Sequence, residues 1–216
     1  MRNRKDFTRP EGVRSARLVV IAAEGRDTEN IYFEAMKGSL CASNVHMEVL
    51  HRDTDDSSPE NVLLQLKTFQ TEYNIEKDDE LWVVVDRDRW EEKMMADVAR
   101  HCSNSGNFQF CVSNPCFELW LLLHLEDVSL YDDSTKRKLY ENKKTSKGRS
   151  SSTWLKKKMK QLLGSYHESD YNAFALLPHI QIAIERAQNL DIRPKDRWPQ
   201  TIGTRVYWLV RSIMGI

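Results

Sequence analysis

The sequence has little of what marks secreted, membrane-spanning and repeat proteins. It has only four cysteines and no C-x-x-C pair, so we expect buried thiols rather than disulfides or a zinc site. No stretch approaches the roughly 20 apolar residues of a membrane helix. The first 17 residues contain no apolar signal core, and no internal repeat is present. These absences predict a cytoplasmic globular protein that does not contact a membrane.

The absence of net charge conceals a strong asymmetry. Basic and acidic residues are equal in number, yet positions 134–160 hold eleven Lys or Arg against the single acid Glu141. Tyr140 and Trp154 lie among these cations beside a run of hydroxyl residues, a composition suited to phosphate contacts and base stacking. The alternative is a solvated face or a linker. We interpret the stretch as a nucleic-acid-binding surface that uses Lys143, Lys144, Lys147, Arg149, Lys156, Lys157 and Lys160.

Short apolar runs and helical patterns alternate through the first 125 residues. This alternation is typical of an α/β fold with a parallel sheet and right-handed crossovers. The pattern predicts strands at 18–23, 46–52, 81–85 and 108–112, and helices at 28–37, 58–73, 90–102 and 115–124. Further helices are expected at 153–163, at 171–190 with a bend at Pro178, and at 201–214.

This pattern divides the chain into three parts. Residues 1–17 form a basic N-terminal arm. Residues 18–129 form the Rossmann-like α/β core, a parallel sheet flanked by helices. Residues 130–216 form a basic helical insertion followed by C-terminal helices that pack on the core.

Three acids follow two of the expected strands. Glu24 comes directly after the first strand, and Asp86 and Asp88 follow the third strand. In parallel sheets, ligands bind outside the carboxyl ends of the strands, and alternation places Asp86 and Asp88 on the same side. Carboxylate oxygens are the ligands that Mg²⁺ prefers. Each acid alone is also ordinary turn or cap chemistry, but together they predict a metal site.

Two further acids are candidates for the same edge. Glu29 lies on the first turn of the helix after Glu24, where it either reaches the site or serves as a capping-box partner of Asp27 or as a surface acid. Glu118 lies one turn into an apolar helix, where a carboxylate is costly to bury without a partner. If Glu118 reaches the site, a two-metal phosphoryl displacement becomes feasible. We therefore name Glu24, Asp86, Asp88 and Glu118 as catalytic candidates, and Glu24, Asp86, Asp88 and Glu29 as metal ligands.

Three motifs carry a resemblance to a known family. They are Ala23-Glu24-Gly25-Arg26-Asp27-Thr28-Glu29-Asn30-Ile31-Tyr32-Phe33, then Asp86-Arg87-Asp88, then Ser113-Asn114-Pro115-Cys116-Phe117-Glu118-Leu119-Trp120 with Leu121-Leu122-Leu123-His124. In this order they resemble the RloB-like (AbiLii-like) family of phage-defence proteins. Trp198-Pro199-Gln200-Thr201 is similar to that family's C-terminal Pro-x-Thr element. Where the family commonly has Cys-Glu-Gly-Glu-x-Thr-Glu-Pro, this chain has Ala23, Arg26 and Asn30, which removes one acid.

The resemblance implies a Toprim-like fold that binds Mg²⁺ or Mn²⁺. It also implies nuclease activity on DNA or RNA, with transfer RNA among the candidates, as the effector of an anti-phage system. The partner implied is a separately encoded ATPase of the RloA/AbiLi-like type, and a homo-oligomer is compatible with it. The chain itself contains no G-x-x-x-x-G-K-[ST] phosphate loop, so any ATP dependence would come from another chain.

Three function classes follow from these observations. The first is a metal-dependent phosphodiesterase. The second is a non-catalytic nucleic-acid or partner-binding module on a Toprim-like scaffold, in which the carboxylates hold a structural metal. The third is nucleotidyl transfer of the primase kind, which the lack of a primase zinc element disfavours. We interpret His124 as a core-edge histidine rather than a general base, and we interpret Tyr140 as a surface aromatic residue.

Overall fold

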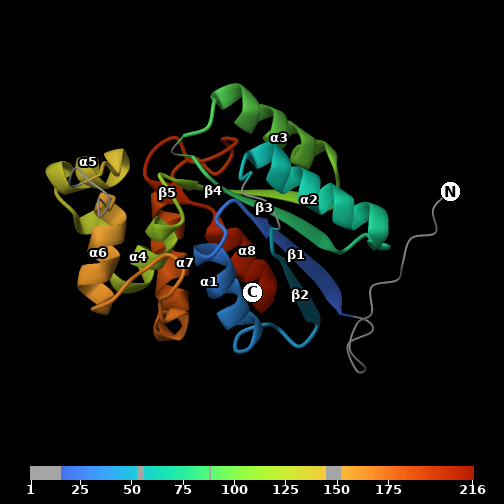
Figure 1. Ribbon diagram of the computed structural model, residues 1–216, viewed down its shortest axis with the longest axis horizontal. Helices are drawn as coiled ribbons and strands as arrows, with labels where there is room; N and C mark the ends of the chain where they lie inside the picture. Colours follow the sequence, from blue (N-terminus) through green and yellow to red (C-terminus); the bar gives the residue numbers. More distant parts are fainter. Residues whose placement is uncertain (1–15, 53–55, 88, 145–151) are drawn as a thin grey trace.

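A five-stranded sheet forms the centre of the protein in the computed structural model (Figure 1), which describes residues 16–52, 56–87, 89–144 and 152–216. The strand order is β2-β1-β3-β4-β5. The first four strands are parallel, and β5 is antiparallel to β4. The strands are β1 (Arg17–Ala23), β2 (Val45–Leu50), β3 (Glu80–Asp86), β4 (Phe108–Asn114) and β5 (Gly203–Thr204).

The apolar runs of the sequence become strands that are buried on both faces. In β1, Val19 and Ile21 belong to one hydrophobic core, and Leu18 and Val20 belong to the core on the opposite face. Successive side chains of a strand point to opposite faces, so a continuous apolar run fits a sheet that is covered on both sides. The predicted α/β class and parallel sheet are confirmed.

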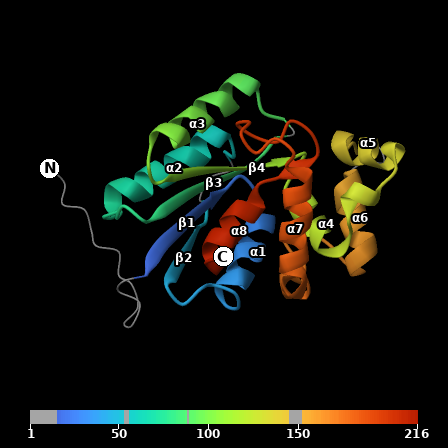
Figure 2. The same ribbon diagram turned by 180° about the vertical axis from the view of Figure 1, so that it is seen from behind.

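Helices cover both faces of this sheet (Figures 1 and 2). On one face lie α2 (Pro59–Glu72) and α3 (Glu92–Asn104), and on the other lie α1 (Thr28–Lys37) and α8 (Val206–Met214). The start of α2 follows the predicted signal, because Ser58 Oγ accepts a hydrogen bond from the Asn61 amide at 3.3 Å and a proline occupies the first turn. The helices fix the positions of the strand ends, where the predicted site lies.

A second group of helices lies beside α1, at the carboxyl end of the parallel strands (Figure 1). The central helix of this group, α4 (Glu118–Leu125), is mostly apolar on all sides and is buried, as expected for a helix enclosed by other helices. It packs against two neighbours of the group. The group consists of α4 (Glu118–Leu125), α5 (Asp133–Glu141), α6 (Trp154–Leu163) and α7 (Ile180–Leu190), with 3₁₀ turns at Val128–Leu130, Ala173–Ala175 and Leu177–His179.

The structure corrects the predicted chain of elements in its second half. The single helix expected over 171–190 is wrong in its first part, because only α7 from Ile180 onward is α-helical. Pro178 has no amide hydrogen and fits the first turn of a helix better than its interior. The pattern also missed α5 and β5. Within 130–216, both β5 and α8 join the layers of the central sheet.

Two further expectations, the basic N-terminal arm and the lack of a membrane helix, can be compared with only part of the chain. The first 15 residues of the predicted basic arm lie outside the described residues. None of the described helices is both long and apolar enough to cross a membrane.

Candidate functional site

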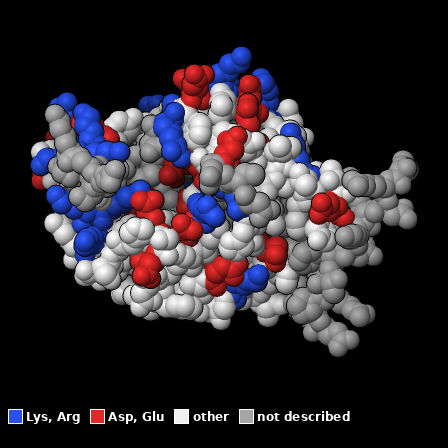
Figure 3. Space-filling model, viewed as in Figure 1, with Lys and Arg blue, Asp and Glu red and all other residues white. Residues whose placement is uncertain are grey.

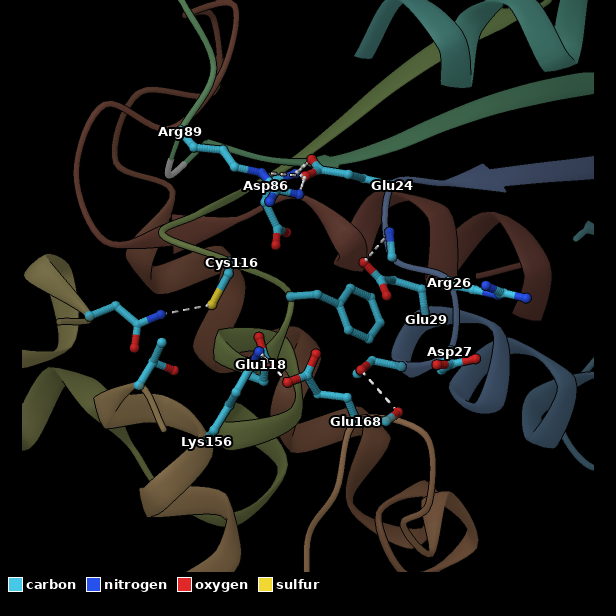
Figure 4. Close-up of a pocket in the computed structure, with 15 residues that line it drawn as sticks. Glu24, Arg26, Asp27, Glu29, Asp86, Arg89, Cys116, Glu118, Lys156 and Glu168 are labelled. Carbon is cyan, nitrogen blue, oxygen red and sulfur yellow. Dashed lines mark hydrogen bonds and ion pairs between the residues drawn. The ribbon is translucent and has the colours of Figure 1, made fainter. Parts of the chain in front are cut away.

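The carboxyl ends of β1 and β3 lie side by side at the point where the strand order reverses. From β1 the chain crosses to β2 on one side of the sheet and then to β3 on the other. Such a reversal opens a crevice, because the connections leave the two strands in opposite directions. A cavity of about 250 Å³ occupies this position (Figure 4). The lining residues that matter for charge are Glu24, Asp27, Glu29, Asp86, Glu118 and Glu168 against Arg26, Arg89 and Lys156.

Glu24 is held by donors from the loop after β3. Its carboxylate is only 3% exposed. Glu24 Oε1 accepts from Arg89 Nη2 at 2.6 Å and Nε at 3.2 Å, while Oε2 accepts from Trp90 Nε1 at 2.8 Å and the Asp86 amide at 3.0 Å. The sequence places Glu24 in the crevice because it follows β1 directly. In this arrangement a guanidinium holds the carboxylate expected to bind metal.

Glu29 points back from α1 toward the end of β1 (Figure 4). It is 3% exposed, and its Oε1 accepts from the Gly25 amide at 3.1 Å. A Cβ at position 25 would lie 1.8 Å from Glu29 Oε2, so the close approach depends on the glycine. The capping-box alternative is wrong, because Asp27 is the N-cap residue and no side-chain hydrogen bond caps the helix.

The pKa of Glu29 reflects its burial beside other carboxylates. Burial raises the pKa of Glu29 to about 7, and the negative charges of Glu118 and Glu24 add to the effect of burial against the opposing backbone hydrogen bonds. A bound cation would favour the charged form of such a carboxyl group.

Glu118 is the first residue of α4 and lies in the same cavity. It accepts a hydrogen bond from Tyr166 Oη at 3.3 Å, and its Oε1 lies 3.8 Å from Lys156 Nζ. Lys156 also pairs with Glu168. Burial alone would lower the pKa of Lys156, but Glu118 and Glu168 outweigh burial and raise it, so this lysine stays charged. The partner of Glu118 therefore lies on the cavity wall rather than on the far side of the helices.

The structure brings together only some of the predicted residues. Asp86 ends β3 and lines the cavity with Glu24, Glu29 and Glu118. Asp88 lies outside the described residues, so the third strand-end carboxylate is not placed. Among the residues that are described, no three His, Cys, Asp or Glu side chains converge closely enough to hold a metal ion.

The predicted nucleic-acid contacts fall into two sets. Lys156 faces the cavity, whereas Lys157 and Lys160 are exposed on α6. Lys143 and Lys144 are exposed at the end of α5, and Lys144 forms an isolated bridge with Thr153 on the cavity rim. Figure 3 shows Lys and Arg gathered over α5 and α6 beside acidic side chains at the centre of the same face. Lys147 and Arg149 lie outside the described residues.

Several site residues were not found from the sequence. Arg89 and Trp90 hold Glu24, and their only sequence signal is a cation and an aromatic residue directly after Asp-Arg-Asp. Asn142 caps α5 in the left-handed conformation (φ 38°) and links it to α6 and to the segment before α4, since it accepts from the Leu155 amide and donates to Cys116 Sγ. A periodicity argument gives no signal for such a link.

His124 is a structural residue in this fold. It is 2% exposed, bonded to Tyr32 Oη at 3.0 Å and to the Trp120 carbonyl oxygen at 2.9 Å. Burial lowers the pKa of His124 to about 4, so the imidazole is neutral at physiological pH.

Together the fold and the site define an α/β protein whose acidic cavity lies at the carboxyl switch point of a mostly parallel sheet. This is the position at which open α/β sheets commonly bind ligands. The chain belongs to the RloB-like protein family, which it matches over residues 19–213. No curated protein and no solved structure matches the chain in the two other comparisons.

Proposed function

We propose that the chain is a Toprim-like, metal-dependent phosphodiesterase that cleaves DNA or RNA. The observation that carries the proposal is the convergence of Glu24, Glu29, Asp86 and Glu118, which come from four separate elements, on one cavity at the carboxyl edge. Buried carboxylates without enough cations are costly. A fold that keeps three buried carboxylates beside the partly buried Asp86 does so for chemistry rather than for stability.

The carboxylate oxygens that line the cavity are the type of ligand that a hard divalent cation prefers. Mg²⁺ and Mn²⁺ prefer oxygen ligands, and the cavity offers several carboxylates, among them Glu29, whose pKa is raised by burial and further by Glu118 and Glu24. Glu24, Asp86 and Asp88 would hold the ion, with Glu29 beside them. When bound, the ion would supply charge stabilisation for phosphoryl transfer. In the described arrangement Arg89 holds Glu24, so binding through Glu24 requires the guanidinium to move.

The protein's own cations suit the anionic substrate. Lys156 lies inside the cavity and its raised pKa keeps it charged, so it can contact a backbone phosphate. Arg89 has a side chain 60% exposed, and once released from Glu24 it offers a fork-shaped donor for phosphate oxygens. Lys143, Lys144, Lys157 and Lys160 are exposed on α6 and just after α5, in the region where Figure 3 shows Lys and Arg gathered.

The proposed biological setting rests on the family. We propose that the chain acts as the effector of an anti-phage system together with a separately encoded ATPase, and a homo-oligomer is compatible with this role. The test is an assay of purified protein with Mg²⁺ or Mn²⁺ on single-stranded, duplex and supercoiled DNA and on transfer RNA, with and without the genomic neighbour. Metal-dependent cleavage abolished by Glu24→Gln supports the proposal. Absence of cleavage under every condition contradicts it.

One observation favours a second candidate, a non-catalytic nucleic-acid or partner-binding module. Both oxygens of Glu24 are already bound by Arg89, Trp90 and the Asp86 amide, as in a structural cluster. In that case Glu24→Gln would lower thermal stability and leave nucleic-acid binding as the protein's principal activity. A comparison of stability and cleavage in this one variant separates the two candidates.

A further inference from the structure

A second cavity, of about 350 Å³, opens beside the first at the same carboxyl edge of the sheet. Its lining comes from the ends of β3 and β4, from the end of α5 and from the segment before β5. By size it falls within the range of small-ligand pockets. The lining residues are Arg87, Asn114, Pro115, Tyr140, Glu141, Asn142 and Gln200.

The two cavities are neighbours. Asn142 lines both of them. At two places in the chain, neighbouring residues line different cavities. Asp86 and Cys116 line the acidic cavity, whereas Arg87 and Pro115 line the second one. Alternation along β3 gives this division directly, because successive side chains point to opposite faces. A polymer that enters the acidic cavity therefore reaches the second cavity by crossing a single strand end.

The lining of the second cavity offers unused donors and an unused aromatic face. Among the described residues, the Arg87 guanidinium makes one hydrogen bond, from Nη1 to the Trp90 carbonyl oxygen at 2.9 Å, and stands 5.9 Å from the Trp198 ring centre. Tyr140 is 48% exposed on the cavity wall, with no hydrogen bond or ring contact to another described residue. An exposed tyrosine ring is a surface on which a base can stack.

A buried amide adds a hydrogen-bonding group. Asn114 is only 6% exposed, and its Nδ2 donates to the Pro199 carbonyl oxygen at 2.9 Å. No hydrogen bond to its Oδ1 is found within the described part of the chain, so this oxygen can accept one from a ligand. Gln200 contributes a second amide, which is exposed. Amide groups of this kind read the edges of bases.

The one acid of this lining does not oppose an anionic ligand strongly. Glu141 is paired with Arg137 Nε at 3.1 Å and with Lys143 Nζ at 3.1 Å, and these two partners hold the pKa of Glu141 below its usual range. Lys143 adds a cation at the end of α5. The region is therefore balanced or positive, in contrast to the acidic cavity.

We propose that this second cavity is a nucleotide subsite, which holds a nucleotide next to the phosphate bound in the acidic cavity. Tyr140 stacks on the base, Arg87 contacts a phosphate through its free donors, and Asn114 Oδ1 accepts from the base edge. This rests on the proposed function, since it assumes that the acidic cavity receives a nucleic-acid strand. Among nucleic acids the subsite favours a single strand, because only an unpaired base presents its face to a ring.

The test measures the binding of short fluorescein-labelled single strands of DNA and RNA to the full chain carrying Glu24→Gln, in chelator, so that no cleavage occurs. In this background Tyr140→Leu is expected to weaken binding about 10-fold, whereas Tyr140→Phe retains the ring and the affinity. Arg87→Gln should weaken binding and reduce the salt slope by about one phosphate contact. Arg100→Gln, on α3 and paired with Asp97, is the matched control and should change neither.

Two results would overturn the subsite. One is unchanged affinity in both Tyr140→Leu and Arg87→Gln, and the other is equal loss in Tyr140→Leu and Tyr140→Phe. Thermal unfolding of each variant shows whether the fold is intact, and the Phe and Leu pair separates stacking from folding. Failure of the proposed function looks different: strands would bind in a Tyr140-dependent manner but would not be cut by the wild-type chain with metal.

Discussion

The two ends of β1 and β3 carry very different polar clusters. At the amino end, Arg17 pairs with Glu80 and also donates to Ser212, and Glu80 accepts from Trp82 Nε1 at 2.7 Å and from Ser212 Oγ at 2.6 Å. This cluster joins one cation and one carboxylate with neutral donors. At the carboxyl end, the described lining of the acidic cavity has six carboxylates against three basic side chains.

Under the proposed function, the difference separates a polar cluster that serves the fold from one that serves chemistry. A matched ion pair with satisfied hydrogen bonds is neutral or modestly stabilising. An excess of carboxylates is held together only against repulsion, and it is retained where function requires it. The same two strands provide both clusters, so burial and sheet position alone cannot explain the surplus at the carboxyl end.

The largest expected effects come from exchanging Glu for Gln at each end. Glu24→Gln and Asp86→Asn should each lower cleavage by on the order of 100-fold or more. The matched change at the amino end, Glu80→Gln, should leave cleavage intact and cost about 1–2 kcal/mol of stability. Cleavage rates and thermal unfolding of the three variants measure both effects. Wild-type cleavage by Glu24→Gln would remove the basis of the comparison.

Glu118 tests whether the surplus extends to α4. Glu118→Gln should reduce cleavage comparably to the Asp86 variant, since the carboxylate lies in the cavity beside Lys156. If Glu118 serves only to anchor Lys156, the Gln variant retains cleavage and binds nucleic acid normally. Rates at saturating substrate, measured together with binding in chelator, distinguish these outcomes.

An Arg89 variant tests whether this arginine restrains Glu24 from binding metal. Arg89→Ala removes the guanidinium that donates to Glu24 Oε1, so Mn²⁺ affinity should increase about 3-fold, a modest change because the arginine side chain is mostly exposed. Arg100→Ala, an exposed arginine paired within α3, is the control. Calorimetric titration with Mn²⁺ measures the change, and weaker binding in Arg89→Ala would show that the arginine supports the site instead of restraining it.

His124 lies outside both clusters, so its replacement should change the stability of the fold and not cleavage. Its pKa is about 4 in the folded chain and about 6.5 when unfolded. Below pH 6.5 the unfolded chain therefore binds more protons, and stability is lost as the pH falls from 6.5 toward 4. Between pH 7.5 and 5, wild type should lose about 2 kcal/mol more than His124→Gln. Urea unfolding at the two pH values checks this, and equal losses would mean that folding leaves the pKa of His124 unchanged.

The sequence predicted the frame of the molecule better than its contacts. The strand-end acids Glu24 and Asp86 could be placed because two long apolar runs identify β1 and β3, and parallel strands end at one edge. Glu29 and Glu118 were placed by helix geometry. Neither argument could find Arg89 or Tyr166, since side chains that hold these acids come from loops whose course no periodicity fixes. The two-residue strand β5 is too short to leave a pattern.

Divalent-metal binding tests most directly whether the surplus of carboxylates at the carboxyl edge serves to bind a cation. Calorimetric titration of Mn²⁺ into the full chain compares wild type with Glu24→Gln and with Glu80→Gln, at neutral pH and without nucleic acid. The account predicts that Glu24→Gln weakens binding by about 10-fold or more whereas Glu80→Gln leaves it unchanged. Equal affinity in all three proteins, or no binding to wild type, would contradict the claim that the acidic cavity is built for a cation.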